Sequence, residues 1–300
     1  MTLSKPDQVH CPVCDSSSSK LWHNNVWKRP GMEVQRCEEC ALVYLHPLME
    51  KDEERRFYAD YGKHLQDRGM IGGATAADLF ETTKPEAMQR MNLVRPYVTS
   101  TMNLVEIGAS AGAFCCAVNE HVHKVIGVEP SQEHAAHMAS LGVTAVPYLD
   151  GLDPNEQFDA AAFFHVLEHM RRPVEFLQDV GKILKPQAYV FVEVPNVQDA
   201  LLSLYNSQEF TDFYYQAMHC VYFSPDTLEG AFHRAGFSTV ELVPKQRYDL
   251  SNHMVWLQKG KPGGMGHFSA VFNSELEANY ESCLKEQWLC DTIFGIFRRG

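Results

Sequence analysis

Short apolar runs alternate with amphipathic stretches over most of the chain. The runs predict seven buried strands, at residues 102–107, 124–128, 144–147, 158–164, 189–194, 239–243 and 292–297. Helical spacing of apolar residues predicts helices at residues 112–122, 131–141, 167–184, 226–235 and 274–287, the third interrupted near Pro173. Alternation of this kind predicts an α/β fold: a Rossmann-like, doubly wound, mostly parallel seven-stranded sheet with helices on both faces.

The N-terminal part of the chain has a different pattern, with short β pieces at residues 33–36 and 42–45 and two Cys-x-x-Cys pairs 22 residues apart. Each pair can offer two thiolates to one ion, which suits tetrahedral Zn²⁺. Four sulfurs leave no open coordination position, so we expect a structural metal in a small zinc ribbon. The alternative, four unrelated cysteines, is disfavoured by the paired spacing. The expected ligands are Cys11, Cys14, Cys37 and Cys40.

Between these two parts lies a charged, aromatic segment. Residues 51–64 are predicted to be helical, a Gly72–Gly73 pair marks a joint, and a helix is expected over residues 85–97 with Pro85 in its first turn. The chain therefore divides into a zinc-ribbon domain at residues 1–50, a helical linker or lid at 51–100, and an α/β domain at 101–300.

Composition narrows the function classes. The formal net charge of −12 argues against a nucleic-acid-binding surface. No apolar run approaches the roughly 18 residues of a membrane-spanning helix, and the first residues do not resemble a signal peptide. Nine cysteines, four of them in a metal pattern, favour a reducing cytoplasm.

The sequence LVEIGASAGAF, residues 104–114, joins a predicted strand to a helix through a glycine loop. Gly108 permits the sharp turn, and Gly112 lets the helix approach closely. Glu129 ends the next strand 21 residues after Gly108, where a carboxylate can accept both hydroxyls of a ribose. These features predict an adenosine-binding half-fold with its ligand at the helix N-terminus.

Two other functions share parts of this pattern. A dinucleotide fold requires G-x-G-x-x-G, which is absent. An α/β-hydrolase requires G-x-S-x-G, and GASAG matches it with Ser110 as nucleophile. However, the motif follows the first strand of the domain, no His-Gly-Gly-Gly segment precedes it, and Glu129 would have no role.

A third interpretation accounts for more of the residues. EIGASAG resembles motif I of class I S-adenosylmethionine-dependent methyltransferases, with Ser110 in place of the middle glycine, and VIGVEPS resembles their second motif. FDAAAFFHVLEHMRRPVEFL, FVEVPNV and HCVYFSPDTLEGAFHRAGF resemble later segments of that family. With its cysteine head, the chain is similar to the deoxysugar C-methyltransferases and their bacterial relatives.

This resemblance implies S-adenosylmethionine and structural Zn²⁺ as cofactors. The residues expected at the S-adenosylmethionine site are Glu106, Gly108, Ala109, Ser110, Gly112, Phe114, Glu129, Pro130, Asp150, Phe164 and His165. His219 is the expected general base or acceptor-orienting residue, the alternative being a cap for the helix that starts at Ser224–Pro225. Tyr58 and Tyr61 are expected over the acceptor, or else in a helix face that packs on the ribbon.

The resemblance also implies a small-molecule acceptor, namely a carbohydrate or nucleotide-linked sugar. The C-methyltransferases carry a Glu–His pair where this chain has Met218 and His219, so O-methylation survives the change better than C-methylation. We expect residues 208–215 to form an acceptor lid, and Lys259 and Lys261 either to meet a diphosphate or to lie in a solvated loop. A non-catalytic, nucleotide-binding zinc-ribbon protein remains the alternative from another class, favoured by Ser110 and Met218.

Overall fold

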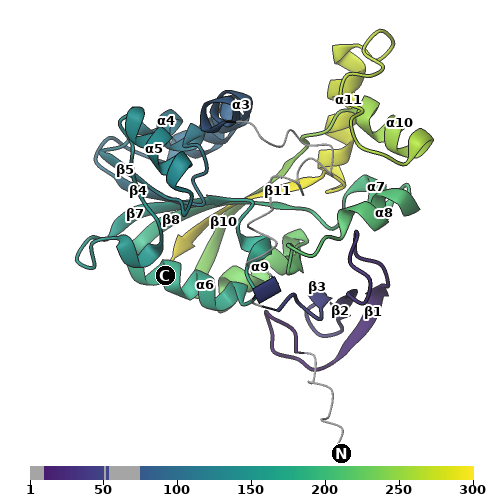
Figure 1. The fold of residues 1–300 in the computed structure, drawn as a ribbon, viewed down its shortest axis with the longest axis horizontal. Coiled ribbons are helices and arrows are strands. Elements are labelled where there is room, and N and C mark those ends of the chain that lie inside the picture. The colour runs from purple at the N-terminus through teal and green to yellow at the C-terminus, as the bar shows by residue number, and fades with distance from the viewer. Residues whose placement is uncertain (1–9, 51, 54–74) are drawn as a thin grey trace, which may run out of the picture.

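The computed structural model describes residues 10–50, 52–53 and 75–300. Its main element is a seven-stranded sheet in the order β10-β11-β8-β7-β4-β5-β6 (Figure 1). Neighbours from β8 to β6 pair in parallel, whereas β11 is antiparallel to both β8 and β10. The predicted α/β fold class is confirmed. The strands are β4 (Asn103–Ile107), β5 (Lys124–Val128), β6 (Thr144–Val146), β7 (Phe158–Phe164), β8 (Leu184–Pro195), β10 (Phe237–Lys245) and β11 (Thr292–Arg299).

Helices cover both faces of the sheet. α3 (Ala76–Val94), α4 (Ala113–Asn119) and α5 (Gln132–Ser140) lie on one face, and α6 (Pro173–Ile183) and α9 (Pro225–Arg234) lie on the other (Figure 1). Successive strand side chains point to opposite faces of the sheet. Leu104 therefore packs in the hydrophobic core on the side of α3 and α4, and Val105 packs in the core on the side of α6 and α9. The strands read as nearly continuous apolar runs because both of their faces are buried.

The helix expected over residues 85–97 begins earlier, and that prediction of its start was wrong. α3 starts at Ala76, where the Thr75 hydroxyl accepts from the Asp78 backbone N–H and the Asp78 carboxylate accepts from the Thr75 N–H. Pro85 lies in the helix interior and cannot donate to the carbonyl of Glu81. Both residues are exposed, so water can reach that carbonyl.

Several short elements were not predicted. Three are helices: α7 (Ala200–Ser203), α8 (Gln208–Tyr214) and α10 (Leu250–Lys259). The 3₁₀ turn η2 (Leu149–Gly151) was not predicted either, whereas η1 (Arg95–Tyr97) and η3 (Leu167–His169) replace parts of the helices predicted over residues 85–97 and 167–184. α11 (Ser274–Glu286) follows the prediction closely. Among helices of the described residues, none combines the length and apolar character needed to cross a membrane.

The cysteine head forms a second, four-stranded sheet. It consists of β1 (Ser19–His23), β2 (Glu33–Cys37), β3 (Val43–His46) and β9 (Val221–Tyr222), in that order. β9 belongs to the C-terminal part of the chain and pairs Tyr222 with Val43 in antiparallel register. A backbone bond from Leu45 N–H to the Cys220 carbonyl, at 3.0 Å, extends this pairing. The four-stranded sheet therefore contains three strands of the head and one strand from the α/β domain.

Candidate active site

The glycine loop makes a tight turn at the carboxyl end of β4. The N–H groups of Gly108 and Ala109 both donate to the Val128 carbonyl, at 2.9 and 3.2 Å. Gly108 and Gly112 have φ values of 74° and 87°, in the left-handed region. A Cβ atom would lie 2.6 Å from Val166 Cγ2 at Gly108, and 2.4 Å from Met138 Cγ at Gly112. Both positions therefore require glycine for conformation and for space.

Glu129 lies beside this loop, as expected. Its carboxylate accepts backbone N–H bonds from Ser110 and Ser131, each at 2.9 Å, and lies 3.7 Å from His134 Nδ1. Burial alone would raise the pKa of Glu129, but His134 and the two backbone donors outweigh it and lower that pKa. A carboxylate offers about four lone-pair sites, so acceptor capacity remains for ribose hydroxyls.

Three other expected cofactor residues are buried. Glu106 is 5% exposed and accepts a hydrogen bond from the Cys115 thiol at 2.9 Å. Burial raises the pKa of Glu106 to about 7, against the opposing effect of the Cys115 bond. Phe114 and Phe164 are buried and pack edge to face, with ring centroids 4.9 Å apart.

The remaining expected cofactor residues flank the loop. Ala109 is buried, while Pro130 is exposed directly after Glu129. Asp150 is exposed in η2, after β6. Because β4, β5 and β6 are parallel neighbours, these positions all lie at the carboxyl edge of the sheet.

His165 directly follows β7 and has a φ of 56°. Its Nε2 lies 3.0 Å from Glu193 Oε1 and 3.0 Å from Arg247 Nη1, and its Nδ1 lies 3.3 Å from Glu168 Oε1. Burial and Arg247 would lower the pKa of His165, but its contacts with Glu168 and Glu193 outweigh them and raise it. β7 pairs with β4, so His165 follows a strand that neighbours the one entering the glycine loop.

A charged network, the Glu193 cluster, surrounds His165. Fully buried Glu193 receives two bonds from the Arg90 guanidinium, at 2.9 and 3.1 Å, and one from Lys245 Nζ at 2.8 Å. Burial would raise the pKa of Glu193, but His165 and Arg90 lower it well below its ordinary value. The members are Glu86, Arg90, His165, Glu193, Lys245 and Arg247. Sequence reasoning missed this cluster, although a glutamate inside the apolar run FVEVP was a signal.

A cavity of about 520 Å³ lies next to His165. One part of its wall is aromatic and the other holds histidines and amides. The aromatic part comes from α8, α10 and the loop after β10: Phe210, Phe213, Tyr214, Tyr248 and Trp256. The loop after α10 contributes Pro262, Gly263 and Met265 to this wall, whereas Lys259 and Lys261 are exposed on the surface.

His219 lines this cavity. Its ring lies edge to face with His169, at a centroid distance of 4.9 Å, and its Nε2 lies 3.2 Å from the Gln216 side-chain amide. The alternative role of His219 as a helix cap is not observed, because Ser224 Oγ accepts from Thr227 N–H at the start of α9. Tyr58 and Tyr61 lie outside the described residues.

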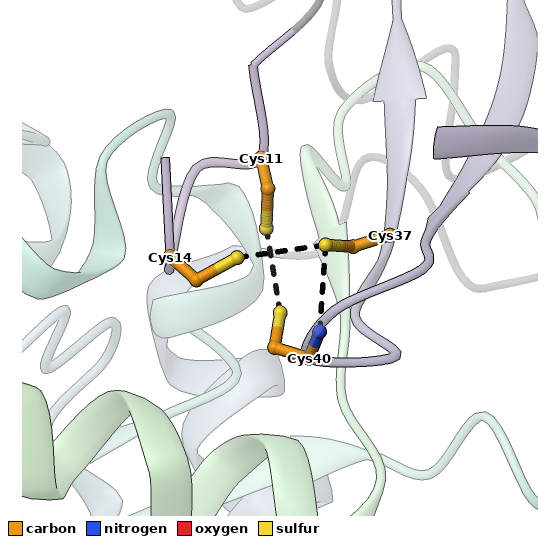
Figure 2. Close-up of side chains that lie close together, drawn as sticks. All are labelled: Cys11, Cys14, Cys37 and Cys40. Atoms are coloured by element: carbon orange, nitrogen blue, oxygen red, sulfur yellow. Dashed lines mark hydrogen bonds between the residues drawn. The ribbon is translucent and has the colours of Figure 1, made fainter. Parts of the chain in front are cut away.

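The four head cysteines converge on one point (Figure 2). The Sγ atoms of Cys11 and Cys40, and those of Cys14 and Cys37, lie 3.5 Å apart, and all four lie within 4.8 Å of one another. A tetrahedral site with Zn–S bonds of about 2.3 Å separates its sulfurs by about 3.8 Å. The spacing fits such a site and is too long for disulfide bonds.

The mostly parallel seven-stranded sheet, with helices on both faces, agrees with the fold that the resemblance implies. A family model described as a methyltransferase domain matches residues 79–242, more than half of the chain. The chain belongs to the methyltransferase family. The match includes the glycine loop, Glu129, the Glu193 position and His219, but not the cysteine head.

Curated relatives of this methyltransferase include ubiquinone biosynthesis O-methyltransferases. The protein from Bradyrhizobium diazoefficiens is 30% identical over 102 residues, which cover 32% of this chain and 40% of the relative. The protein from Bradyrhizobium sp. strain ORS 278 is 29% identical over 104 residues, covering 32% and 41%. The chain thus matches about two fifths of the length of these relatives.

Solved structures share the fold at low sequence identity. One is a chain in the complex between the Haloferax volcanii Trm112 methyltransferase activator and a methyltransferase, with TM-score 0.52, 13% identity, and coverage of 74% of this chain and 95% of that one. Another is an S-adenosylmethionine-dependent methyltransferase from Archaeoglobus fulgidus, with TM-score 0.50, 19% identity, and coverage of 72% and 94%. These similarities support the class I methyltransferase fold.

Proposed function

We propose that this protein transfers a methyl group from S-adenosylmethionine to a hydroxyl of a small polar acceptor. The observation that carries the proposal is the position of the cavity: it is lined by His165, which follows β7, and β7 pairs with the strand that enters the glycine loop. A cofactor at that loop and an acceptor in the cavity would therefore lie side by side.

The loop and Glu129 are suited to hold the cofactor. The backbone from Gly108 to Gly112 approaches closely without side chains, and the Glu129 carboxylate offers acceptors for ribose hydroxyls. Bound S-adenosylmethionine supplies a methyl group already activated on a sulfonium, so the protein mainly positions the acceptor and handles one proton. Ser110 serves here as a loop residue through its backbone N–H, in contrast to its role in a hydrolase.

His219 is our choice for the residue that orients the acceptor hydroxyl or accepts its proton. It lines the cavity, and the Gln216 amide and the His169 ring hold its imidazole. The preceding residue, Met218, is apolar and 6% exposed, so the sequence neighbour of His219 supplies no carboxylate. This favours a hydroxyl acceptor, because removing a proton from carbon requires a stronger base.

The cavity wall supports a ring-shaped acceptor. Aromatic side chains offer flat surfaces for a ring, while Asp199, Asn252 and His253 offer hydrogen bonds to its hydroxyls. By resemblance of the head and the body, we propose a sugar or nucleotide-linked sugar. A phenolic ring is the second candidate, since the partial relatives are ubiquinone biosynthesis O-methyltransferases. We also propose a structural Zn²⁺ bound by the four head cysteines, whose sulfur spacing fits it.

Calorimetric titration with S-adenosylhomocysteine tests the cofactor assignment, with NAD as control. We expect one-to-one binding of the first alone, and loss of at least tenfold in affinity for Glu129→Gln, whose amide cannot replace both acceptor oxygens. Ser110→Ala should bind normally, because the contact of Ser110 with Glu129 uses its backbone. Absence of binding in folded, zinc-loaded protein would overturn the proposal. Methylation assays with nucleotide-linked sugars and with catechols then decide the acceptor class.

A further inference from the structure

A second group of potential metal ligands lies in the wall of the acceptor cavity. One ligand atom each from Glu168, His169 and His219 lies within 4.8 Å of the others. His169 and His219 both line the cavity. We propose that these three residues bind a divalent transition-metal cation that in turn binds the acceptor hydroxyl.

Glu168 provides the first argument. It is 1% exposed, and its Oε1 lies 3.3 Å from His165 Nδ1. Its other oxygen, Oε2, is buried without a hydrogen-bond partner among the described residues. A buried carboxylate oxygen is unfavourable unless a donor or a cation meets it, and a cation beside His169 and His219 would do so.

His169 provides the second argument. Its Nδ1 lies 3.0 Å from the Met218 carbonyl, so Nδ1 carries the proton and donates it. The lone pair of Nε2 is then the one available to a metal. Histidine ligands commonly have this arrangement, in which one ring nitrogen donates to a backbone carbonyl and the other binds the ion.

The ligand set indicates the kind of cation. Two imidazoles and one carboxylate suit Zn²⁺, Fe²⁺, Co²⁺ or Mn²⁺, whereas Mg²⁺ prefers oxygen ligands. Three protein ligands leave positions open, in contrast to the four-cysteine site in the head. A cation there would lower the pKa of a bound acceptor hydroxyl.

The inference rests on the proposed function and refines the role of His219, which would act on the acceptor through the cation. The acceptor hydroxyl releases its proton to solvent. Its oxygen then forms a bond to the methyl carbon as the carbon–sulfur bond breaks, and the electron pair of that bond stays on sulfur. The step needs no oxidant or reductant.

Electron paramagnetic resonance with Mn²⁺ tests the site in protein loaded with a single equivalent of Zn²⁺, which the four thiolates of the head bind before a three-ligand site does. Mn²⁺ is a hard ion that competes poorly for a four-thiolate site, so its signal reports the Glu–His–His site. We expect one bound Mn²⁺ per chain, and at least about tenfold weaker binding in His169→Ala and in His219→Ala. His233→Ala, a surface histidine bonded to Thr239, should bind Mn²⁺ as the wild type does.

Glu168→Gln provides a further check, because it retains the volume of the buried side chain and an oxygen acceptor for His165. It should fold, bind S-adenosylhomocysteine and lose Mn²⁺ affinity. Failure of Mn²⁺ to bind to wild-type protein that does bind S-adenosylhomocysteine would overturn this inference and leave the proposed function standing. Failure to bind S-adenosylhomocysteine would overturn the proposed function, whatever the result with Mn²⁺.

Discussion

At the scale of single residues, the candidate cofactor site could largely be located from the sequence. Gly108 and Gly112 are required where a turn and a close approach leave no space for Cβ, and such requirements are written directly in a sequence. Glu129 follows a strand and reaches the loop through backbone donors that any sequence provides. The placement of these residues was therefore predictable, whereas the burial of Phe114 and Phe164 depended on the packing of helices and strands around them.

Substitution of Gly112 tests the close approach of α4. Gly112→Ala should destabilise the protein by roughly 2–4 kcal/mol, since it combines a left-handed conformation with a clash against Met138. Gly142→Ala is the matched control, because φ is 80° there and nothing lies within 4 Å of the added Cβ. Chemical denaturation measures both. Equal losses of stability in the two variants would show that the backbone conformation alone matters. Adding Met138→Ala should partly restore the stability of Gly112→Ala but not that of Gly142→Ala.

Glu106 predicts a pH dependence of stability. Its pKa in the folded protein is about 7, above the ordinary 4.5, so the folded state holds the proton more tightly than the unfolded chain does. Its contribution to stability is fully present below about pH 4.5 and is lost as pH rises to about 7, by on the order of 3 kcal/mol.

Glu106→Gln should remove this dependence. The variant should match the wild type near pH 5 and exceed its free energy of unfolding near pH 8, because glutamine carries no charge to bury. Urea denaturation at the two pH values makes the measurement. Glu120→Gln, at an exposed residue just after α4, should follow the wild type at both. Parallel pH profiles for Glu106→Gln and the wild type would contradict the assignment.

At the scale of elements, the Glu193 cluster joins α3 to the sheet. Glu86 and Arg90 come from α3, Glu193 from β8 and Lys245 from β10. The strands were predictable because a buried strand has a clear apolar pattern. The cluster was not, because its charges are separated by up to 161 residues between Glu86 and Arg247 and only the fold brings them together.

Breaking the cluster should be costly. Arg90→Met should destabilise the protein by about 3–5 kcal/mol, since it leaves the fully buried Glu193 carboxylate undercompensated. Arg90→Met combined with Glu193→Gln should recover part of the loss. Lys182→Met, which removes an exposed pair with Asp179, should cost at most about 1 kcal/mol. Thermal denaturation of the wild type and these three variants makes the measurement. Equal loss of stability in Arg90→Met and Lys182→Met would contradict the prediction.

The start of α3 shows a limit of local signals. Thr75 and Asp78 form a capping box, yet Pro85 is an equally valid start signal in the sequence. The nine residues from Ala76 to Lys84 decide where the helix starts, and they are polar enough to lack a clear helical stripe. α8 and α10 were missed for a different reason. They lie in connections between predicted elements, α8 between β8 and α9 and α10 between β10 and α11, and they form the aromatic wall of the cavity.

At the scale of the whole molecule, the cysteine head is tied to the α/β domain. Beyond the pairing of β3 with β9, Trp27 N–H donates to the Tyr215 carbonyl at 2.8 Å, and His23 Nε2 lies 2.9 Å from Asp212 Oδ1. The sequence could not predict this, because a two-residue strand such as β9 has no periodic pattern.

Loss of the Zn²⁺ proposed for the head should therefore affect the whole protein. Cys37→Ser should release zinc and lower the melting temperature by roughly 5 °C or more, within a single transition. Cys283→Ser, at an exposed cysteine outside the cluster, should leave both zinc content and melting temperature unchanged. Calorimetry together with zinc analysis makes the test. Two separate transitions, with only the first shifted, would show instead that the head and body unfold independently.

The shared sheet also sets rules for building chimaeras of this protein. Exchanging residues 10–50 for the head of a related enzyme would replace β3 but keep β9, and Val221 and Tyr222 would then face a strand they did not evolve with. The same segment holds His219 and Cys220, so a mismatched graft would reach the acceptor cavity. The transplantable unit is discontinuous: the head together with the segment from α8 to β9.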